Sequence, residues 1–575
     1  MRQQRSAWLS GWLVALAAGC MFVAPLEDLP EASGGKPSRG GEAGSVTGFG
    51  GAEDAGAAGN GASAGDAGAG NQGSGGTKPD GPCETNAECV QRFSEAPARC
   101  RPSDHRCVPL LNDVCPFAYG DAKDPNAIFF GAFTTFDEAA IQNNSISWAH
   151  QLALVELSGN NIGGLPDGPG GKRRPLVMSL CSNLTEDVDA AMEHLADELE
   201  VPAVIATLRP GDLRRVYDEY IDRKLLYLSP VTVTQTLVEQ DEQNLIWNLL
   251  GTPTDLAPVY RPLLLKTEAF VRDERGLEPG IALRVALVTT PEAFDSELGA
   301  AIPDLLELNG KTVAENGGNY RGFTIDPEEP ELDEVAASII EFRPHVILSA
   351  AGDILSREGG LLSRVEEGWE LGVVAPPEGL DFRPQWILSP YNAGNLEWLA
   401  QVIKGSISVA GRGMEQRFVG ISIAGPTNTT LQNSYASRLR TKFPKAYLDS
   451  ANYYDALYFL AYGMYAAPAK APLDGPGIAR GLGRLLEGKA FNIGPLTISS
   501  VFDALSDADA TIKLNSTLGP ASFDPKTGVR AVSGSVFCFE PSGGDVTLRT
   551  DVLRYDAQTQ QLVGDKFDCF SGFLE

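Results

Sequence analysis

Short, continuous apolar runs alternate with longer amphipathic segments along the chain beyond residue 125. Runs without polar alternation are typical of strands that are buried on both faces, as in parallel sheets covered by helices. These runs lie at 127–130, 176–180, 203–206, 225–228, 285–288, 346–348, 386–388 and 419–423. The alternation of strand and helix predicts an α/β protein with doubly wound parallel sheets.

The segments between the runs carry helix signals. Val188, Met192, Leu195 and Leu199 recur at helical spacing and form one apolar stripe. The pair Thr290-Pro291 follows a predicted strand and supplies a capping hydroxyl and a first-turn proline. We therefore expect helices to connect successive strands.

Polar and aromatic side chains follow many of the predicted strands. In doubly wound sheets a ligand binds outside the carboxyl ends of the strands, where loops and helix starts converge. Hydroxyl groups and helix-start amides suit a carboxylate or another small anion, although each such residue also serves as an ordinary cap or turn former. The candidate ligand-binding residues are Thr134, Thr135, Thr207, Arg209, Ser229, Thr232, Phe294, Asp353 and Tyr391.

The N-terminus resembles a bacterial lipoprotein signal. Basic residues precede an apolar run at 8–18, which is too short to span a bilayer. The run ends in Leu-Ala-Ala-Gly-Cys, which resembles the lipobox and implies lipidation of Cys20 after removal of residues 1–19. Because Met21 and not Asp follows the cysteine, the resemblance to Gram-negative lipoproteins implies the outer membrane, at its periplasmic face or the cell surface. An ordinary signal peptide with an incidental cysteine is the alternative.

Residues 20–80 are rich in Gly, Ala and Ser and contain few large apolar side chains. Such a composition cannot form a core, so this stretch is predicted to be a flexible tether. Residues 81–115 are short and cysteine-rich, which predicts a small disulfide-stapled module. A zinc site is the competing interpretation, but the segment has no CxxC pair and His105 is its only histidine.

Apart from Cys20 the chain has an even number of cysteines, as expected of a protein oxidised outside the cytoplasm. We expect two bridges among the first four, one between Cys115 and Cys181, and one between Cys538 and Cys569. The disulfide candidates are Cys83, Cys89, Cys100, Cys107, Cys115, Cys181, Cys538 and Cys569.

Several ordered segments are similar to the type-I periplasmic binding proteins, the family of the leucine, isoleucine and valine carriers and of receptor ligand-binding regions. They are the Ser-Pro-Val-Thr end of the run at 225–232, Thr-Pro-Thr-Asp at 252–255, Ala-Asn-Tyr-Tyr-Asp-Ala at 451–456, and Gly519 to Gly528 with Ser-Phe-Asp. The resemblance implies two lobes joined by three crossings. Lobe 1 would comprise 125–252 and 427–530, and lobe 2 would comprise 256–425 and 531–575.

The chain departs from the family's amino-acid binders at two loops. The loop at 206–210 lacks the usual glycines and offers only Thr207 as a hydroxyl, and the loop at 291–295 keeps an aromatic residue but no glycine. Amino-acid specificity is therefore in doubt, and Arg209 is the candidate partner for an acidic ligand.

Two segments resemble catalytic motifs but lack residues that those motifs need. Gly-Ile-Ser-Ile-Ala around Ser422 resembles a nucleophile elbow, but all four histidines precede that serine, whereas the elbow needs a later one. Asn-Gly-Lys-Thr at 309–312 ends like a P-loop but lacks the first glycine. It also follows a predicted helix instead of a strand, so Gly310 is interpreted as a helix-terminating glycine. The histidines show no metal-binding spacing. We expect no enzyme activity, no cofactor and no metal.

With 46 Lys and Arg against 75 Asp and Glu, the formal net charge of −29 argues against a nucleic-acid partner. The sequence thus predicts a lipid-anchored cell-envelope lipoprotein that binds a small solute, amino-acid-like or anionic, in an interlobe cleft. Its role would be transport or sensing, with a transporter or surface protein as possible partner. The alternative is a ligand-free surface scaffold that engages a protein partner.

Overall fold

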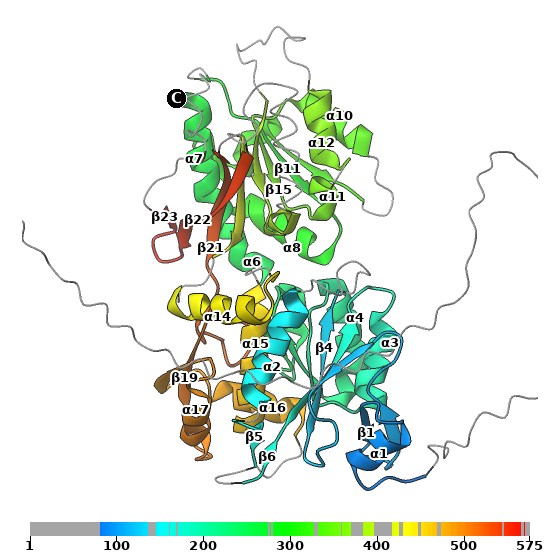
Figure 1. The fold of residues 1–575 in the computed structure, drawn as a ribbon. Coiled ribbons are helices and arrows are strands. Elements are labelled where there is room, and N and C mark those ends of the chain that lie inside the picture. The colour runs from blue at the N-terminus through cyan, green and yellow to red at the C-terminus, as the bar shows by residue number, and fades with distance from the viewer. Residues whose placement is uncertain are drawn as a thin grey trace, which may run out of the picture.

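The computed structural model describes residues 81–575 except 136–144, 160, 168–170, 274–276, 278–279, 327–331, 358, 370–382, 396–416, 425–428, 447–449, 469–472, 543–544, 565–568 and 570–575. The described part forms two lobes, one above the other in Figure 1. The predicted signal peptide, Cys20 and the tether lie outside the described residues.

Lobe 1 is built on a six-stranded sheet in the order β10-β9-β8-β4-β7-β3, in which only β3 runs antiparallel to its neighbour. The strands are β3 (Phe117–Tyr119), β4 (Ile128–Thr134), β7 (Leu176–Ser182), β8 (Ala203–Ile205), β9 (Leu226–Ser229) and β10 (Ile246–Asn248). Every residue of β4 and β7 is buried, as predicted for strands covered on both faces.

Helices cover both faces of this sheet, and alternate residues of β4 point to different cores. Phe130 and Ala132 belong to a core with α2 (Ser145–Ser158), α14 (Thr429–Lys442), α15 (Ala451–Ala466), α16 (Gly475–Gly483) and α17 (Ile498–Leu505). Phe129 and Phe133 belong to the opposite core, with α3 (Val188–Met192), the π-helix η1 (Glu193–Glu198), α4 (Pro210–Tyr220), the 3-10 turn η2 (Ile221–Arg223) and α5 (Gln235–Gln240). The predicted stripe from Val188 to Leu199 therefore lies on a helix that widens to π geometry halfway.

Three small sheets complete lobe 1 and its flank. They are β5 (Leu165–Pro166) with β6 (Arg173–Arg174), β18 (Lys489–Asn492) with β19 (Ile512–Ser516) and β20 (Gly519–Pro520), and β1 (Ala98–Cys100) with β2 (Cys107–Pro109). The hairpin β5–β6 follows α2 and precedes β7, so it lies at the amino ends of the strands, away from lobe 2 (Figure 1).

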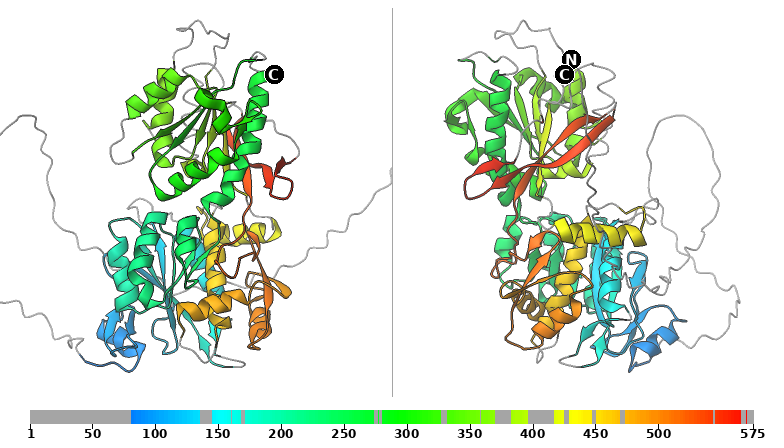
Figure 2. Two further views of the ribbon diagram at one scale, coloured as in Figure 1. Left: turned by 180° about the vertical axis from the view of Figure 1, so that it is seen from behind. Right: turned by 60° about the vertical axis from the view of Figure 1, so that its left-hand side comes forward.

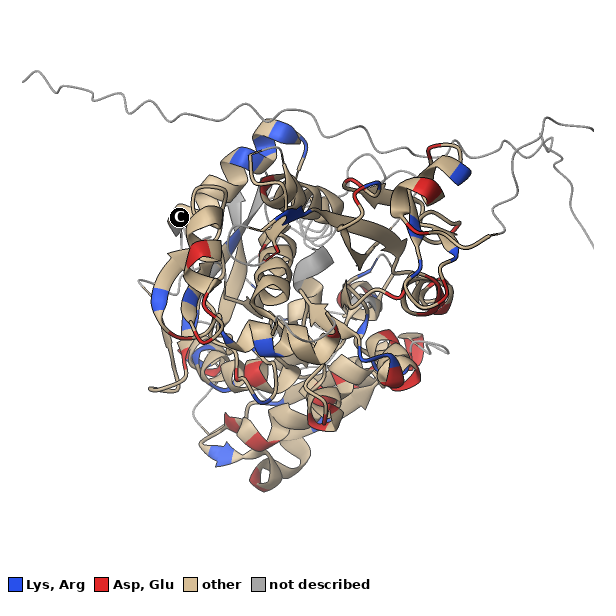
Figure 3. Cartoon of the chain, turned by 90° about the horizontal axis from the view of Figure 1, so that it is seen from below, with Lys and Arg blue, Asp and Glu red and all other residues tan. Residues whose placement is uncertain are grey.

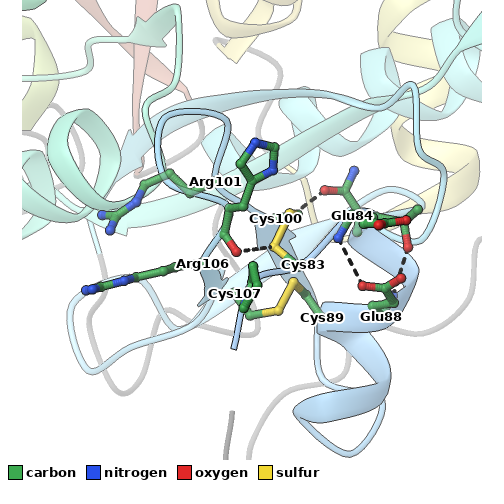
Figure 4. The surroundings of a disulfide bond; sticks show 12 residues. Cys83, Glu84, Glu88, Cys89, Cys100, Arg101, Arg106 and Cys107 are labelled. Carbon is green, nitrogen blue, oxygen red and sulfur yellow. Dashed lines mark hydrogen bonds between the residues drawn. A yellow bond between two sulfur atoms is a disulfide. The ribbon is translucent and has the colours of Figure 1, made fainter. Parts of the chain in front are cut away.

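The cysteine-rich module consists of α1 (Asn86–Arg92) and the hairpin β1–β2. Disulfides Cys83–Cys100 and Cys89–Cys107 tie the α1 segment to the two strands side by side (Figure 4). The sulfur atoms of Cys83, Cys89 and Cys100 lie within 4.8 Å of one another because the two bridges are adjacent. All of these cysteines are disulfide-bonded, so none has a thiolate to offer the zinc ion considered above.

This module has no core of its own and packs on lobe 1. Its buried residues share a core with Phe129 and Leu195. Arg99 donates to the carbonyl oxygens of Leu199 and Glu200, just after η1, and stacks on Phe129 at 4.9 Å. The last carbonyl groups of a helix lack internal partners and favour cations, so Arg99 both caps this helix and attaches the module.

Disulfide Cys115–Cys181 continues the attachment by joining the end of the module to β7. The fourth bridge, Cys538–Cys569, lies in lobe 2. The grouping of the eight cysteines predicted from the sequence is confirmed.

Lobe 2 is built on an eight-stranded sheet in the order β14-β11-β15-β16-β17-β21-β22-β23, of which the first five strands are parallel and the last three antiparallel. They are β11 (Val285–Thr289), β14 (Tyr320–Thr324), β15 (Val346–Ser349), β16 (Gln385–Leu388), β17 (Phe418–Ile423), β21 (Gly534–Ser542), β22 (Asp545–Asp556) and β23 (Gln561–Val563). The antiparallel strands form the red hairpin at one edge of the lobe in Figure 2.

Two cores again flank the sheet. One contains residues of α6 (Pro253–Leu256), η3 (Ala257–Val259), α7 (Tyr260–Asp273) and α8 (Ala293–Leu305), and the other residues of α10 (Leu332–Phe342), α11 (Asp353–Ser356) and α12 (Leu361–Gly368). The remaining elements are β12 (Glu307–Leu308), β13 (Lys311–Thr312), α9 (Val313–Asn316), η4 (Gly317–Asn319) and η5 (Pro390–Asn395).

The interpretation of Gly310 as a helix-terminating glycine is wrong. Asn309 and Gly310 form the two-residue turn between the antiparallel strands β12 and β13, and both have positive φ, 54° and 68°. An Asn-Gly pair with left-handed backbone is the preferred turn of a tight hairpin. The side chain of Asn309 also accepts from the backbone N–H of Leu283 at 2.7 Å, which ties this hairpin to the strand β11 segment.

The chain passes between the lobes three times: between β10 and α6, between β17 and α14, and between β20 and β21. All eight apolar runs predicted as strands are strands, and parallel sheets covered by helices dominate both lobes. The predicted fold class, two doubly wound parallel-sheet lobes joined by crossings, is confirmed.

Acidic and basic residues are interspersed over the end of the molecule that Figure 3 shows, with no single basic face. Among the described residues, no helix combines the length and the apolar character needed to span a lipid bilayer.

Candidate functional site

The carboxyl ends of the parallel strands in the two lobes face each other. In lobe 1, β10 leads directly into α6, which lies between the lobes (Figure 1). In lobe 2, β17 leads back to α14 of lobe 1. We call the loops and helix starts at these ends the interlobe boundary. It is the location that doubly wound sheets use for ligands.

Thr207 follows β8 at this boundary and has an unusual environment. It is 6% exposed, and its hydroxyl oxygen has no hydrogen-bond partner among the described residues. Its carbonyl oxygen accepts from Asn183 at 3.0 Å, which fixes the backbone. A buried hydroxyl without a partner costs free energy, so such a group in a native protein calls for an explanation.

Ser229 and Thr232 belong to the loop after β9. The Ser229 hydroxyl donates to the carbonyl oxygen of Val231 at 2.9 Å, and the side chains of Asn248 and Asn452 donate to the same loop at 3.0 and 2.8 Å. Ser229 is fully buried, whereas Thr232 is half-buried. The structure therefore uses Ser229 to hold the loop, and it leaves Thr232 at the boundary.

The remaining lobe 1 candidates differ in exposure. Thr134 is fully buried at the end of β4, and Thr135 is exposed directly after it. Arg209 is exposed and lies just before the first turn of α4. Residues 136–144, which follow Thr135, lie outside the described residues.

In lobe 2, two aromatic residues meet at the boundary. Phe294, in the first turn of α8, is 3% exposed and packs edge-on against Tyr391 with ring centroids 4.5 Å apart and an interplanar angle of 83°. Tyr391 is 40% exposed. Asp353 begins α11, and its side chain lies outside the described residues.

Beneath this pair lies Asp295, which the sequence prediction missed. It is 1% exposed and accepts from the Thr290 hydroxyl at 2.7 Å and from the Gly352 backbone N–H at 2.8 Å. Burial raises the pKa of this carboxyl to about 7, although both hydrogen bonds oppose the shift. Asp295 thus connects the loops after β11 and β15 and positions the backbone beside Tyr391. Its place one residue after Phe294, at a helix start, was the available sequence signal.

Lobe 1 side chains influence Tyr391 of lobe 2. Burial raises the pKa of the Tyr391 phenol, whereas the positive charge of Arg209 and the side chain of Thr232, both of lobe 1, oppose this shift. We call Thr207, Arg209 and Thr232 the lobe 1 wall of the candidate site, and Phe294 and Tyr391 its lobe 2 wall. The first wall supplies hydroxyls and a cation, and the second supplies aromatic surface.

The described residues do not assemble the catalytic triad considered above. Ser422 lies in β17, half-buried, and shares a 2.8 Å hydrogen bond with Ser535. His194 bonds Glu198 and the carbonyl oxygen of Leu110 in lobe 1, and His345 accepts from the Arg284 backbone N–H at 2.8 Å. His150 is fully buried in α2 beside Tyr453.

No family model matches the chain, and no curated protein matches it. Solved structures similar to it include the branched-chain amino acid transporter substrate-binding protein LivJ from Streptococcus pneumoniae, in complex with isoleucine. It is 13% identical, covers 74% of this chain and 99% of its own, and has a TM-score of 0.46. A solute-binding protein of an ABC transporter from Rhodopseudomonas palustris, in complex with 3,4-dihydroxybenzoic acid, is 12% identical. The match covers 75% of this chain and 98% of that protein, with a TM-score of 0.49. A type 1 periplasmic binding protein from Bordetella pertussis is 12% identical. The match covers 74% of this chain and 100% of that protein, with a TM-score of 0.48.

Proposed function

We propose that this protein binds a small solute between its two lobes, for transport or sensing at the cell envelope, and that it catalyses no reaction. The observation that carries the proposal is the hydroxyl of Thr207, buried without a partner at the carboxyl end of β8. A ligand that accepts or donates one hydrogen bond there would satisfy it. Phe294 and Tyr391 on the other lobe supply apolar surface, as small-molecule sites usually require.

The ligand class follows from the charges at the boundary. Arg209 is the exposed cation of the lobe 1 wall, and Thr207 and Thr232 add hydroxyl groups. A small molecule with a carboxylate and an apolar body fits both walls, because the carboxylate pairs with Arg209 and the body contacts the aromatic rings.

A thermal-shift screen tests this proposal on the oxidised protein. Isoleucine and 3,4-dihydroxybenzoate, which the similar solved structures contain, head a panel of amino acids, dicarboxylates and aromatic acids. A ligand at about 100 times its dissociation constant stabilises the fold by about 2.7 kcal/mol. A panel without any hit on folded protein contradicts the proposal.

The variant Thr207→Val separates binding from folding, because it is expected to leave the stability of the free protein unchanged or raised but to lower the affinity for the ligand. Without ligand the variant is expected to be as stable as the wild type or more stable by up to about 1 kcal/mol, since an unpaired buried hydroxyl is removed. Its affinity for the hit is expected to fall about fivefold to tenfold, since one hydrogen bond is lost.

Thr267→Val is the matched control. Thr267 is fully buried in α7, and its hydroxyl donates to the carbonyl oxygen of Leu263 at 2.9 Å, within lobe 2. This variant is expected to lose a little stability and to bind the ligand like the wild type. Equal affinity in both variants would remove Thr207 from the site.

The ligand-free scaffold is the second candidate function. It is favoured by the influence of the lobe 1 groups Arg209 and Thr232 on Tyr391 of lobe 2, which indicates that protein groups of both lobes approach each other where a ligand would lie. In that case the panel gives no hit, and the protein partner is sought by crosslinking at the cell surface.

We further propose that the protein is lipidated at Cys20 and attached to the outer membrane through the residues before the cysteine-rich module. The support is the sequence alone, together with four disulfides of the kind that form outside the cytoplasm.

A further inference from the structure

One side chain of lobe 2 bonds to the backbone of lobe 1. Glu297, in the second turn of α8, accepts from the N–H of Gln235 at 2.7 Å through one carboxylate oxygen and from the N–H of Thr236 at 3.0 Å through the other. Gln235 and Thr236 are the first two residues of α5 in lobe 1. The carboxylate is half-buried.

The receiving end of α5 is chemically suited to this contact. The first N–H groups of a helix have no partner inside the helix, and the helix dipole favours a negative charge there. The Thr234 side chain satisfies the next N–H, that of Leu237, at 3.3 Å. Glu297 therefore completes a helix cap that lobe 1 supplies only in part.

Glu297 is also coupled to the candidate site through its helix. It lies three residues after Phe294, so both project from the same side of α8 toward the boundary. Any motion that separates the lobes withdraws the carboxylate from both N–H groups at once, because donor and acceptor belong to different lobes.

We propose that Glu297 is a latch that holds the lobes closed and sets how readily a ligand reaches the site. This inference rests on the proposed function for its purpose, because a latch matters to a protein whose lobes must part to admit a solute. Opening then exchanges two charge-assisted hydrogen bonds for water, and closure restores them.

Two variants break the latch from opposite lobes. Glu297→Ala removes the carboxylate. Gln235→Pro removes the donor with the 2.7 Å bond, and it suits α5 because Gln235 is the first helical residue and Thr234 has the extended backbone (φ −74°, ψ 146°) that a residue before proline prefers. Glu239→Gln is the control. Glu239 is an exposed residue of α5, and this substitution removes one negative charge, as Glu297→Ala does.

The measurement is single-molecule energy transfer without ligand, in the full chain, between dyes at the exposed positions Glu219 of α4 and Glu334 of α10. Both latch variants are expected to shift the ratio of open to closed molecules roughly tenfold toward open, Glu297→Ala at least as far as Gln235→Pro. Glu239→Gln is expected to match the wild type.

Wild-type distributions in both latch variants would overturn the proposal. Hydrogen exchange at the Leu237 N–H, which Thr234 protects in all variants, checks that α5 remains folded. Because the distances are measured without ligand, the latch is tested independently of the solute screen, and a chain that binds nothing still gives an answer.

Discussion

Asp295 gives the sharpest quantitative test of the structure. Its carboxyl is 1% exposed, and burial raises its pKa to about 7. In the unfolded chain an aspartate has a pKa of about 3.9. The folded state therefore holds this proton more tightly, so the proton stabilises the fold at low pH, and the stabilisation is lost as the pH rises from about 4 through about 7.

The magnitude follows from the two pKa values. Between pH 5 and pH 8 the free energy of unfolding should fall by about 2.6 kcal/mol from this group alone. Asp295→Asn removes the titration, and its amide oxygen can still accept from Thr290 and from the Gly352 N–H. The stability of the wild type relative to the variant should therefore decline by about 2.6 kcal/mol over this range.

The assay is urea unfolding of both proteins at several pH values, with the two lobes fitted as separate transitions because each has its own cores. The comparison with the variant is needed because other groups also titrate. Burial raises the pKa of Asp455 to about 6, and it lowers that of His345 to about 4. These contributions cancel in the difference. A difference that stays constant within about 0.5 kcal/mol from pH 5 to pH 8 would show that Asp295 is ionised throughout, and it would refute the reasoning.

Three further outcomes are expected. Glu366→Gln should destabilise lobe 2 by about 3 to 5 kcal/mol in urea unfolding, because Arg417, bonded to this carboxylate at 2.8 Å through both of its terminal nitrogens, is left buried without its counter-charge. Arg99→Ala should cost lobe 1 about 2 kcal/mol and speed proteolysis of the cysteine-rich module, whereas the exposed Arg106→Ala should do neither. Cys20→Ser should abolish incorporation of a radiolabelled fatty acid in cells, and unchanged labelling would exclude lipidation at this position.

The parallel strands were predictable from the sequence because a strand buried on both faces consists mostly of consecutive apolar residues. Every residue from Leu176 to Ser182 is buried, and the sequence has a largely apolar run at this place. The antiparallel strands were harder to predict. In β22 polar residues interrupt the apolar ones at short intervals, so the segment lacks a continuous apolar run. In β21 the sequence signal was Cys538, a predicted disulfide partner.

The candidate site was predictable only in part. Phe294 and Tyr391 lie in the helical turns that follow β11 and β16, where the sequence predicts segments after strands, but their contact spans nearly a hundred residues and depends on how the loops of lobe 2 fold. Glu297 resembles any exposed helix glutamate in the sequence. Its role depends on the orientation of one lobe against the other, which no local pattern encodes.

The distribution of crosslinks explains why noncovalent contacts at the boundary matter. Cys83–Cys100, Cys89–Cys107 and Cys115–Cys181 all lie in the module and lobe 1, and Cys538–Cys569 lies in lobe 2. None of these four bridges joins the lobes, so each stiffens one body and leaves the three crossings as the covalent links between them. The relative position of the lobes is then set by weak contacts such as that of Glu297, which contributes about 1 to 2 kcal/mol, less than the roughly 8 kcal/mol that a solute of micromolar affinity supplies. A solute that contacts both walls can therefore decide whether the lobes stay together.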